Sequence, residues 1–261
     1  MKKYELTNET KEINGCTLHR IVALRDFGNV KKGYLGGFIE KESNLSHANT
    51  CWIYDDGIVC GESRLCEGSE VHDNAVVCGT STIWENSRIF ENAYVCDSLI
   101  GRSKIHGNAS VNNAEVLCGA EVKDRVLIKG GRIESDVVIA DNVTVSGNSY
   151  ISGYNVTVGE NASIVDGMVL SNDDWRVFGG YNDRYVTWLR KGDYFVLNGM
   201  KYTAYGLIEY AHKVGGYALA NTISAIAGVE MLKSQKAKIQ SRTKTFIAKK
   251  INFQAVSKLT L

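Results

Sequence analysis

Seven cysteines and five histidines are the side chains of this sequence best suited to reactive chemistry. The cysteines are Cys16, Cys51, Cys60, Cys66, Cys78, Cys96 and Cys118, and the histidines are His19, His47, His72, His106 and His212. Cysteine and histidine can bind zinc together, and either can act as a nucleophile or a general base. Cys60, Cys78 and Cys96 are spaced eighteen residues apart, and the sequence has no CxxC pair. This regular spacing points to a repeated structural unit rather than to a compact metal site.

The composition fits a strand-rich protein without an export signal. The chain has 261 residues, 44% of them apolar, a formal net charge of +1 and no proline. Proline cannot donate a backbone N–H to a strand ladder, so its absence suits a fold in which nearly every N–H is paired. No apolar stretch follows the charged start MKKYELTNET. We therefore expect no signal peptide, no membrane segment, and reduced thiols in a cytoplasmic protein.

Aliphatic residues recur every six residues through the middle of the chain, with steps of five to seven after the eighth. They are Ile53, Val59, Leu65, Val71, Val77, Ile83, Ile89, Val95, Ile100, Ile105, Val111, Val116, Val122, Ile128, Ile133, Ile139, Val145, Ile151, Val158 and Ile164. A small residue usually stands two positions before each of them, and Asn, Gly or Asp usually stands three positions before. Neither a helix nor an ordinary alternating strand has a period of six. The pattern predicts short strands separated by sharp corners.

Three such strands would make one triangular coil, and successive coils would stack at a spacing of about 4.8 Å. The expected fold class is therefore mainly β, a parallel β-solenoid of roughly six to seven triangular coils over residues 51–170. Asn, Gly and Asp tolerate positive φ best, so Asn92 and Asn108 are expected to have positive φ at their corners.

The two ends lack the repeat and are expected to cap the solenoid, whose last strands would otherwise be exposed. Residues 1–50 form the expected N-terminal β cap, with strands at 4–6 and 17–24, a turn at 14–15, and residues 35–39 leading into the solenoid. Residues 171–235 form the expected small β/α domain, with strands at 186–189, 194–197 and 200–203 and helices at 207–213 and 218–236. Residues 236–261 form a basic extension, since the chain has eight Lys/Arg and no Asp/Glu from Met231 onward.

The repeat resembles that of the hexapeptide-repeat, left-handed parallel β-helix proteins, which are best known as acyltransferases. The segment IVALRDFGNVKKGYLGGFIEKESNLSHANTCWIYDD is similar to the start of the YdcK-like proteins, which are classed as transferases and come from enterobacteria and their phages. The resemblance covers residues 1–170 well and the C-terminal ninety residues only in outline. It implies a left-handed coil. For an acyltransferase it also implies a histidine base, held on a loop or between subunits, and coenzyme A lying along the coils.

Stacking of coils would align outward side chains one coil apart, which defines two candidate sites. On the first face, Tyr54, His72 and Phe90 form a candidate binding ladder that His106 continues. On the second face the candidate interface is apolar and consists of Ile58, Cys60, Val76, Cys78, Tyr94 and Cys96. A neighbouring subunit, in a dimer or trimer, or the chain's own C-terminal helix should cover it. No metal site is expected, because a straight ladder of thiols does not converge on one ion.

Two functions remain open from the sequence. The first is a non-enzymatic binding or scaffold protein, phage-derived if the resemblance holds, that engages a macromolecular partner and needs no cofactor. The alternative is an acyl-coenzyme A-dependent acyltransferase with His106 as its catalytic base, although no insertion between the repeats is long enough to be a catalytic loop. Motifs of nucleotide-binding loops, serine hydrolases, zinc proteases and EF-hands are absent from the sequence. The basic extension could bind an acidic partner or nucleic acid, or lie against the acidic body of its own chain.

Overall fold

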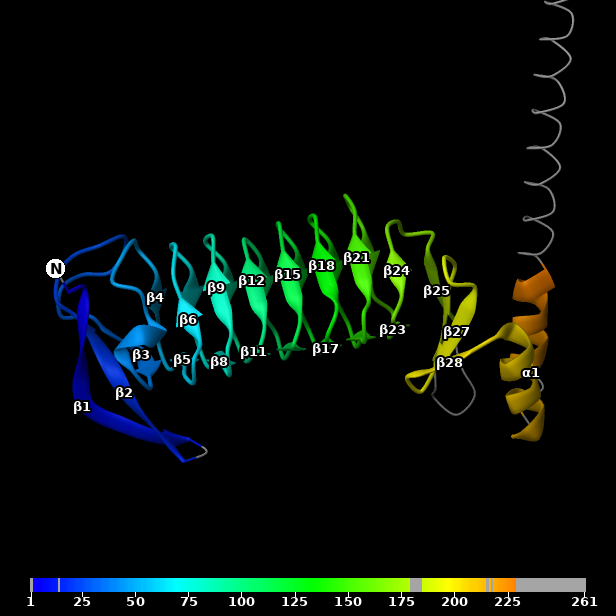
Figure 1. Cartoon of the computed structure of the whole chain (residues 1–261), viewed down its shortest axis with the longest axis horizontal. Coiled ribbons are helices and arrows are strands. Elements are labelled where there is room, and N and C mark those ends of the chain that lie inside the picture. Colours follow the sequence, from blue (N-terminus) through cyan, green and yellow to red (C-terminus); the bar gives the residue numbers. More distant parts are fainter. Residues whose placement is uncertain (1, 14, 179–184, 215, 217, 229–261) are drawn as a thin grey trace, which may run out of the picture. The chain divides into compact units, whose positions relative to one another are not determined.

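The computed structural model describes residues 2–13, 15–178, 185–214, 216 and 218–228 (Figure 1). The chain divides into two compact units, Met1–Lys201 and Tyr202–Leu261. Each unit is described by itself.

Short parallel strands on three faces form a β-solenoid in the first unit, as the repeat predicted (Figure 1). The first face consists of β4 (Trp52–Ile53), β7 (Glu70–Val71), β10 (Arg88–Ile89), β13 (Lys104–Ile105), β16 (Glu121–Val122), β19 (Val138–Ile139) and β22 (Thr157–Val158). The second consists of β5 (Ile58–Val59), β8 (Val76–Cys78), β11 (Tyr94–Cys96), β14 (Ser110–Asn112), β17 (Leu127–Lys129), β20 (Thr144–Ser146) and β23 (Ser163–Val165). The third consists of β6 (Arg64–Leu65), β9 (Thr82–Trp84), β12 (Leu99–Gly101), β15 (Glu115–Leu117), β18 (Arg132–Glu134), β21 (Tyr150–Ser152) and β24 (Met168–Val169).

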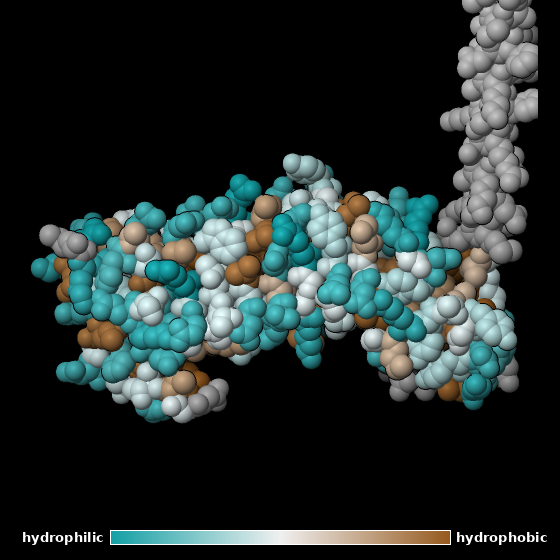
Figure 2. All heavy atoms as spheres, viewed as in Figure 1, coloured by the Kyte–Doolittle hydropathy of each residue, from teal (hydrophilic) through white to brown (hydrophobic). Residues whose placement is uncertain are grey.

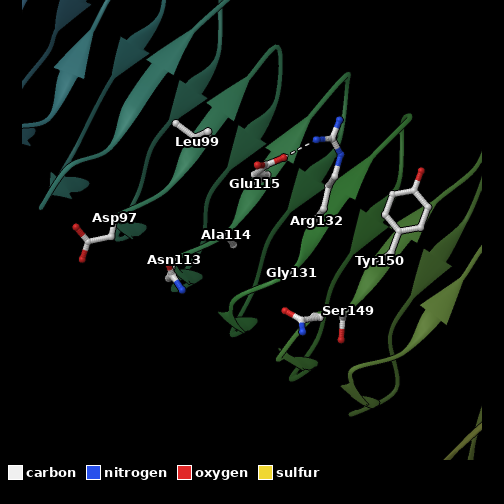
Figure 3. A pocket seen from close by; sticks show the side chains of 10 residues that line it. Asp97, Leu99, Asn113, Ala114, Glu115, Gly131, Arg132, Ser149 and Tyr150 are labelled. Carbon is white, nitrogen blue, oxygen red and sulfur yellow. Dashed lines mark hydrogen bonds and ion pairs between the residues drawn. The ribbon is translucent and has the colours of Figure 1, made fainter.

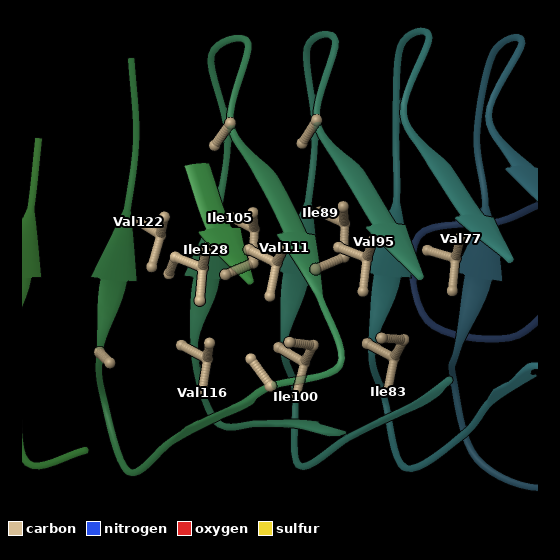
Figure 4. Packing of buried hydrophobic residues seen from close by; sticks show 14 of the residues in the cluster. Val77, Ile83, Ile89, Val95, Ile100, Ile105, Val111, Val116, Val122 and Ile128 are labelled. Atoms are coloured by element: carbon tan, nitrogen blue, oxygen red, sulfur yellow. The ribbon is translucent and has the colours of Figure 1, made fainter. Parts of the chain in front are cut away.

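The inward aliphatic residues of successive coils stack on one another and form the core (Figure 4). Val77 pairs with Val59 of the previous coil and Val95 of the next, and all three are fully buried. All twenty predicted inward residues are buried, and Val169 adds one more. Within the described residues, seven strands line each face, and β3 (Leu35–Ile39) with the bridge from Leu45 adds a partial turn. The solenoid therefore has about eight turns rather than the six to seven predicted.

The corner prediction for Asn92 and Asn108 is wrong by one residue. Neither has positive φ; the preceding residues do, with φ of 59° at Glu91 and 72° at Gly107. Asn92 instead lies in a side-chain ladder, in which its amide donates to the Asn108 carbonyl oxygen at 3.3 Å. Its own carbonyl oxygen accepts from the amide of Asn74 at 3.4 Å.

Hydrogen bonds between coils explain why the residues before Asn74, Asn92 and Asn108 take the left-handed conformation. At this corner the Asp73 carboxylate accepts a hydrogen bond from the backbone N–H of Glu91 at 2.8 Å, and Glu91 accepts from Gly107 N–H at 2.6 Å. Asp124 and Asp141 do the same farther along, with backbone N–H groups of Asp141 and Glu160 as donors at 3.0 and 2.8 Å. Each coil thus satisfies a corner N–H of the next coil, which offsets the cost of positive φ.

An N-terminal cap closes the first end of the solenoid. It contains β1 (Tyr4–Ile13), β2 (Cys16–Ala23), β3 and a short 3₁₀ helix at Glu42–Asn44. β1 and β2 form an antiparallel hairpin, here called the N-terminal hairpin, and β2 pairs with β3, which pairs in parallel with β5. The Asn44 side chain donates to two carbonyl oxygens of the first coil, those of Gly61 and Ser63, at 3.0 and 2.8 Å. Asn14, half of the predicted turn, lies outside the described residues.

A four-stranded sheet caps the other end, formed by β25 (Trp175–Phe178), β26 (Val186–Leu189), β27 (Tyr194–Leu197) and β28 (Met200–Tyr202). β25 was not predicted. The Thr187 hydroxyl accepts from Ser163 N–H at 2.7 Å, and the Tyr194 hydroxyl donates to the Val165 carbonyl at 2.6 Å. Side chains of this sheet thus satisfy two backbone groups of β23, at an edge where another strand could otherwise add.

The described part of the second unit is helical. α1 spans Ala204–Lys213, three residues longer at its start than predicted, and Thr203 caps it by accepting from Gly206 N–H at 3.1 Å. Residues 218–228 form a second helical segment. The rest of the predicted helix to Lys236 and the basic extension 236–261 lie outside the described residues. No described helix has the length and apolar character needed to cross a membrane.

Candidate functional site

Outward side chains of the first face form two stacked pairs of rings. The rings of Tyr54 and His72 lie 4.3 Å apart with an angle of 7° between their planes, and those of Phe90 and His106 lie 4.4 Å apart at 8°. The structure therefore brings the residues of the predicted binding ladder into the predicted order. Because a stacked pair uses ring faces for its own contact, these four side chains have less ring surface left for a ligand than isolated aromatic residues would.

Carboxylates hold both histidines. His72 Nε2 lies 3.0 Å from the Glu70 carboxylate, which Arg88 also contacts at 3.1 Å. His106 Nε2 lies 2.9 Å from Glu121, while its Nδ1 faces Glu91 at 3.7 Å. The hydrogen bonds from the two histidines lower the pKa of the Glu70 and Glu121 carboxyls.

A general base needs a ring nitrogen directed at its substrate. Glu121 engages Nε2 of His106, whereas Nδ1 lies 3.7 Å from Glu91, which is too far for a hydrogen bond. The contacts of His106 are those of a side chain that bridges neighbouring coils on a solvent-facing surface.

The thiols of the second face are stacked on one another from coil to coil. Cys78 and Cys96 are paired in register, and the Cys78 thiol lies 3.0 Å from the Tyr94 hydroxyl oxygen. Burial raises the pKa of Cys60 to about 11, and burial together with a hydrogen bond from Cys78 raises that of Cys96 to about 12. Thiols with such pKa values are protonated at neutral pH and are poor nucleophiles. No group of three or more His, Cys, Asp or Glu side chains among the described residues could hold a metal ion.

The candidate interface on this face is smaller than the sequence predicted, because the N-terminal hairpin covers part of it. The expectation that Ile58 is exposed is wrong, since only 4% of its surface is accessible. The far end of the hairpin curves under β5 and β8 (Figure 1). The cluster that results comprises Leu18, Phe38 and Ile58, with Ile13, Cys16, Cys60 and Val76 packed against it. Tyr94, 39% exposed, is the most accessible residue of the predicted set, and its coverage by another subunit stays a prediction.

A groove of about 500 Å³ runs along the edge between the second and third faces, and we call it the edge groove (Figure 3). Equivalent residues from four successive coils line it, namely Asp97, Leu99, Asn113, Ala114, Glu115, Gly131, Arg132, Asn148, Ser149 and Tyr150. None of the histidines or cysteines discussed above is among them. The repeat could have located this groove, because Leu99, Glu115, Arg132 and Tyr150 each directly precede an inward aliphatic residue.

An ionic network orders the middle of the edge groove. Arg132 donates to Glu115 at 2.5 Å and to Glu134 at 2.8 Å, and the Tyr150 hydroxyl donates to Glu134 at 2.5 Å. The hydrogen bond from Tyr150, followed by that from Arg132, lowers the pKa of the Glu134 carboxyl. Leu99 lies beside this network with 41% of its surface exposed. The groove therefore joins fixed charges to an accessible apolar side chain.

Comparison with known proteins gives one local similarity to a curated protein. Over 77 residues the chain is 30% identical to a protein of Escherichia coli (strain K12) named "Uncharacterized acetyltransferase YdcK". The chain resembles the YdcK-like hexapeptide-repeat proteins. The match spans 26% of this chain and 24% of YdcK, so about a quarter of that relative's length is covered. No family model matches the chain.

Proposed function

We propose that this chain is a non-enzymatic binding protein that engages a protein partner through the edge groove and the neighbouring side chain of Tyr94. One observation carries the proposal: the edge groove offers an exposed apolar residue and an ordered charge network, while the histidines and the cysteines lie elsewhere. Tyr94 stands three residues before Asp97 in the same coil, so it extends the groove towards the second face.

The lining of the edge groove favours a protein over a small apolar ligand. Tyr and Arg are enriched in protein interfaces, where they combine apolar contact with directed hydrogen bonds. Arg132 is already oriented by Glu115 and Glu134, so a partner would meet a preformed charge pattern. The side of the solenoid drawn in Figure 2 is mostly hydrophilic, with small separate hydrophobic areas. A few accessible apolar residues, including Leu99 at 41% exposure, would therefore act as anchors within a polar surface.

The backbone limits how such a partner can bind. Strands of the middle coils are hydrogen-bonded on both sides, as in β11, which pairs with β8 and β14. A partner could not add a strand there, so it would have to bind through contacts with the side chains of successive coils. This requirement fits a groove whose lining repeats from coil to coil.

A second candidate function is acyl transfer from acyl-coenzyme A, favoured by the local similarity to YdcK, which is named as an acetyltransferase. His106 would be its catalytic base and coenzyme A its cofactor. In this chain Glu121 holds Nε2 of that histidine, so the substrate proton would have to be accepted by Nδ1, which lies 3.7 Å from Glu91.

A binding measurement separates the two candidates. Purified full-length chain is titrated with coenzyme A and with acetyl-coenzyme A while its melting temperature is followed. A ligand selective for the native state at one hundred times its Kd stabilises a protein by about 2.7 kcal/mol, which this method detects easily. We expect no shift. A shift that is present in the parent and absent in His106→Ala would favour the transferase and contradict the binding proposal.

A second measurement tests the surface itself. A benzophenone side chain is placed at Leu99 and, as a control, at Thr157, an exposed position on the first face. Irradiation in cells that contain the natural partner should give a discrete adduct from position 99 and none from position 157. Adduct formation equal at both positions, or absent at position 99, would contradict the proposal.

The mass of the adduct also identifies self-association. An adduct of two copies would mean that the partner is a second subunit of this chain, as in the expected dimer or trimer. In that case, Tyr94→Lys combined with Leu99→Lys should lower the mass measured by light scattering to that of one chain.

A further inference from the structure

A second groove, of about 530 Å³, lies between the second face and the sheet that caps the last coil, and we call it the end groove. Its lining comes from β17, β20 and β23 and from residues beside β26 and β28. The lining residues are Leu127, Lys129, Asn142, Thr144, Val145, Ser146, Asn161, Ser163, Tyr185, Asn198 and Gly199. All belong to the first compact unit. The proposed partner surface at the edge groove shares none of them.

The described lining of the end groove contains amides, hydroxyls and one cation, and no carboxylate. The amides are those of Asn142, Asn161 and Asn198, the hydroxyls those of Thr144, Ser146, Ser163 and Tyr185, and the cation is Lys129. This set differs from the edge groove, whose lining contains two carboxylates, and where Arg132 is paired with one of them, that of Glu115.

Several of these polar groups have unused hydrogen-bonding capacity. Asn142 is fully engaged, since it accepts from Arg125 and donates to the carbonyl oxygen of Asn161, both at 2.6 Å. Among the described residues, no hydrogen bond or ion pair involves the Asn161 amide nitrogen, the Ser146 hydroxyl or the Lys129 ammonium. Within the described part of the chain, donors of three neighbouring coils thus have no partner at this groove.

The acidic residue that follows β23 forms its ion pair with a lysine other than Lys129. Asp166, at the end of β23, accepts from Lys201 at 2.8 Å and from Asn148 N–H at 2.9 Å. These contacts lower the pKa of the Asp166 carboxyl, with the hydrogen bond from Lys201 as the largest cause. Lys201 therefore neutralises Asp166, and the ammonium of Lys129 is left to attract an external anion.

We propose that the end groove binds a small, hydroxyl-rich anion, a sugar that carries a carboxylate or a phosphate. Amides and hydroxyls can donate and accept at once, which matches the hydroxyl groups of a sugar. Lys129 binds the anionic group, and the carbon atoms of Leu127 and Tyr185 contact the apolar edges of the ring. A volume of about 530 Å³ lies within the range of small-molecule sites.

Isothermal titration of the full-length chain tests this site with four probes: glucuronate, glucose 6-phosphate, glucose and inorganic phosphate. We expect the two sugar anions to bind, and neutral glucose and inorganic phosphate each to bind at least about tenfold more weakly. Glucose lacks the anionic group, and inorganic phosphate lacks the hydroxyl groups of the sugar. Binding of the sugar anions should also weaken as salt is added. The proposal is wrong if neither sugar anion binds with a Kd below about 10 mM, or if inorganic phosphate binds as well as glucose 6-phosphate.

Three variants assign the binding to the end groove. Lys129→Gln should weaken glucuronate binding at least about tenfold and leave glucose binding unchanged, because it removes only the cation. Asn161→Ala should weaken glucuronate and glucose alike and leave inorganic phosphate unchanged. Lys123→Gln removes the same charge from the first face and should have no effect. These side chains are at least partly exposed, so the variants should keep the fold of the parent, which circular dichroism verifies. Asn161→Ala should be less stable than the parent, because Asn161 has a φ of 61° and its side chain accepts a hydrogen bond from Asn142. Equal losses in Lys129→Gln and Lys123→Gln would overturn the assignment.

Discussion

The inner and outer surfaces of the solenoid wall follow different rules although they share one backbone. Inside, Val77, Val95 and Val111 repeat the same chemistry in register from coil to coil, and all are fully buried. Outside, the neighbouring positions change from Val76 to Tyr94 to Ser110. Packing fixes the inner residues, because an aliphatic neighbour one coil away leaves room only for another aliphatic residue. The outer residues are free to vary, so any function must be sought there.

A second difference separates two parts of the outer surface. On the first face, His72 and His106 stack on rings of the previous coil and contact carboxylates, so their polar atoms are satisfied within the chain. In the end groove, Lys129 and the Asn161 amide nitrogen have no such partners among the described residues. The histidines of the first face therefore serve to hold neighbouring coils together. The side chains with unused hydrogen-bonding capacity are instead the amides, hydroxyls and lysine of the end groove.

The largest expected effect comes from a charge placed on the inner surface. Val77→Asp would bury a carboxylate without a partner in the centre of the core, and we expect it to lower the free energy of unfolding by about 3 kcal/mol or more. Ser110→Asp, which places the same side chain on the outer surface, should change it by about 0.5 kcal/mol or less. Thermal or denaturant unfolding measures both. A Val77→Asp protein that melts within about 2 °C of the parent would show that the inner and outer surfaces do not differ as described.

An intermediate effect is expected at a corner, where inner and outer surfaces meet. Asp73 has a φ of 55°, and its carboxylate accepts from Glu91 N–H at 2.8 Å. Asp73→Ala would lose this hydrogen bond and keep the strained conformation, at a cost of about 1–2 kcal/mol. Asp73→Gly should cost less because glycine tolerates positive φ, and Asp73→Asn should cost least because it keeps an acceptor.

Denaturant unfolding should therefore rank the corner variants in the order Asn, Gly, Ala from most to least stable. Asn92→Ala is the comparison: it removes two long side-chain hydrogen bonds but no corner carboxylate, and Asn92 does not have positive φ, so it should cost less than Asp73→Ala. An alanine variant at position 73 as stable as the parent would mean that the carboxylate ladder contributes nothing.

Regular features of the fold could be predicted from sequence because each is repeated many times. Twenty inward residues at nearly constant spacing define the core, and the stacking of Tyr54 on His72 follows from the same register. The corner φ values could not be assigned to the right residue, because Glu91 and Asn92 are both polar. The choice between them depends on a hydrogen bond to the next coil.

Features that depend on distant segments escaped prediction. The cover over Ile58 comes from Leu18 on the N-terminal hairpin, and a hairpin sequence does not state which surface it will curve towards. The end groove brings Lys129 together with Asn198, residues far apart in sequence and in different kinds of structure. Neither contact belongs to the repeat, so periodicity contained no information about them.

The smallest expected effect concerns an outer carboxylate whose charge is stabilised by its neighbours. Hydrogen bonds from Tyr150 and Arg132 lower the pKa of Glu134 below its ordinary value of 4.5. Because the folded pKa is the lower one, the ionised carboxylate stabilises the fold. That stabilisation is fully present above pH 4.5 and is lost as pH falls through the lowered folded pKa. The partly exposed setting limits this stabilisation to about 0.5 kcal/mol at neutral pH.

Glu134→Gln should therefore be slightly less stable than the parent at pH 7, and the difference should shrink as the pH falls below 4.5. Glu5→Gln is the matched control, since Glu5 is exposed and has no ion pair among the described residues. Urea unfolding at a series of pH values measures the effect. A difference between Glu134→Gln and the parent that stays constant from pH 7 to about pH 3 would show that the charge of Glu134 does not contribute.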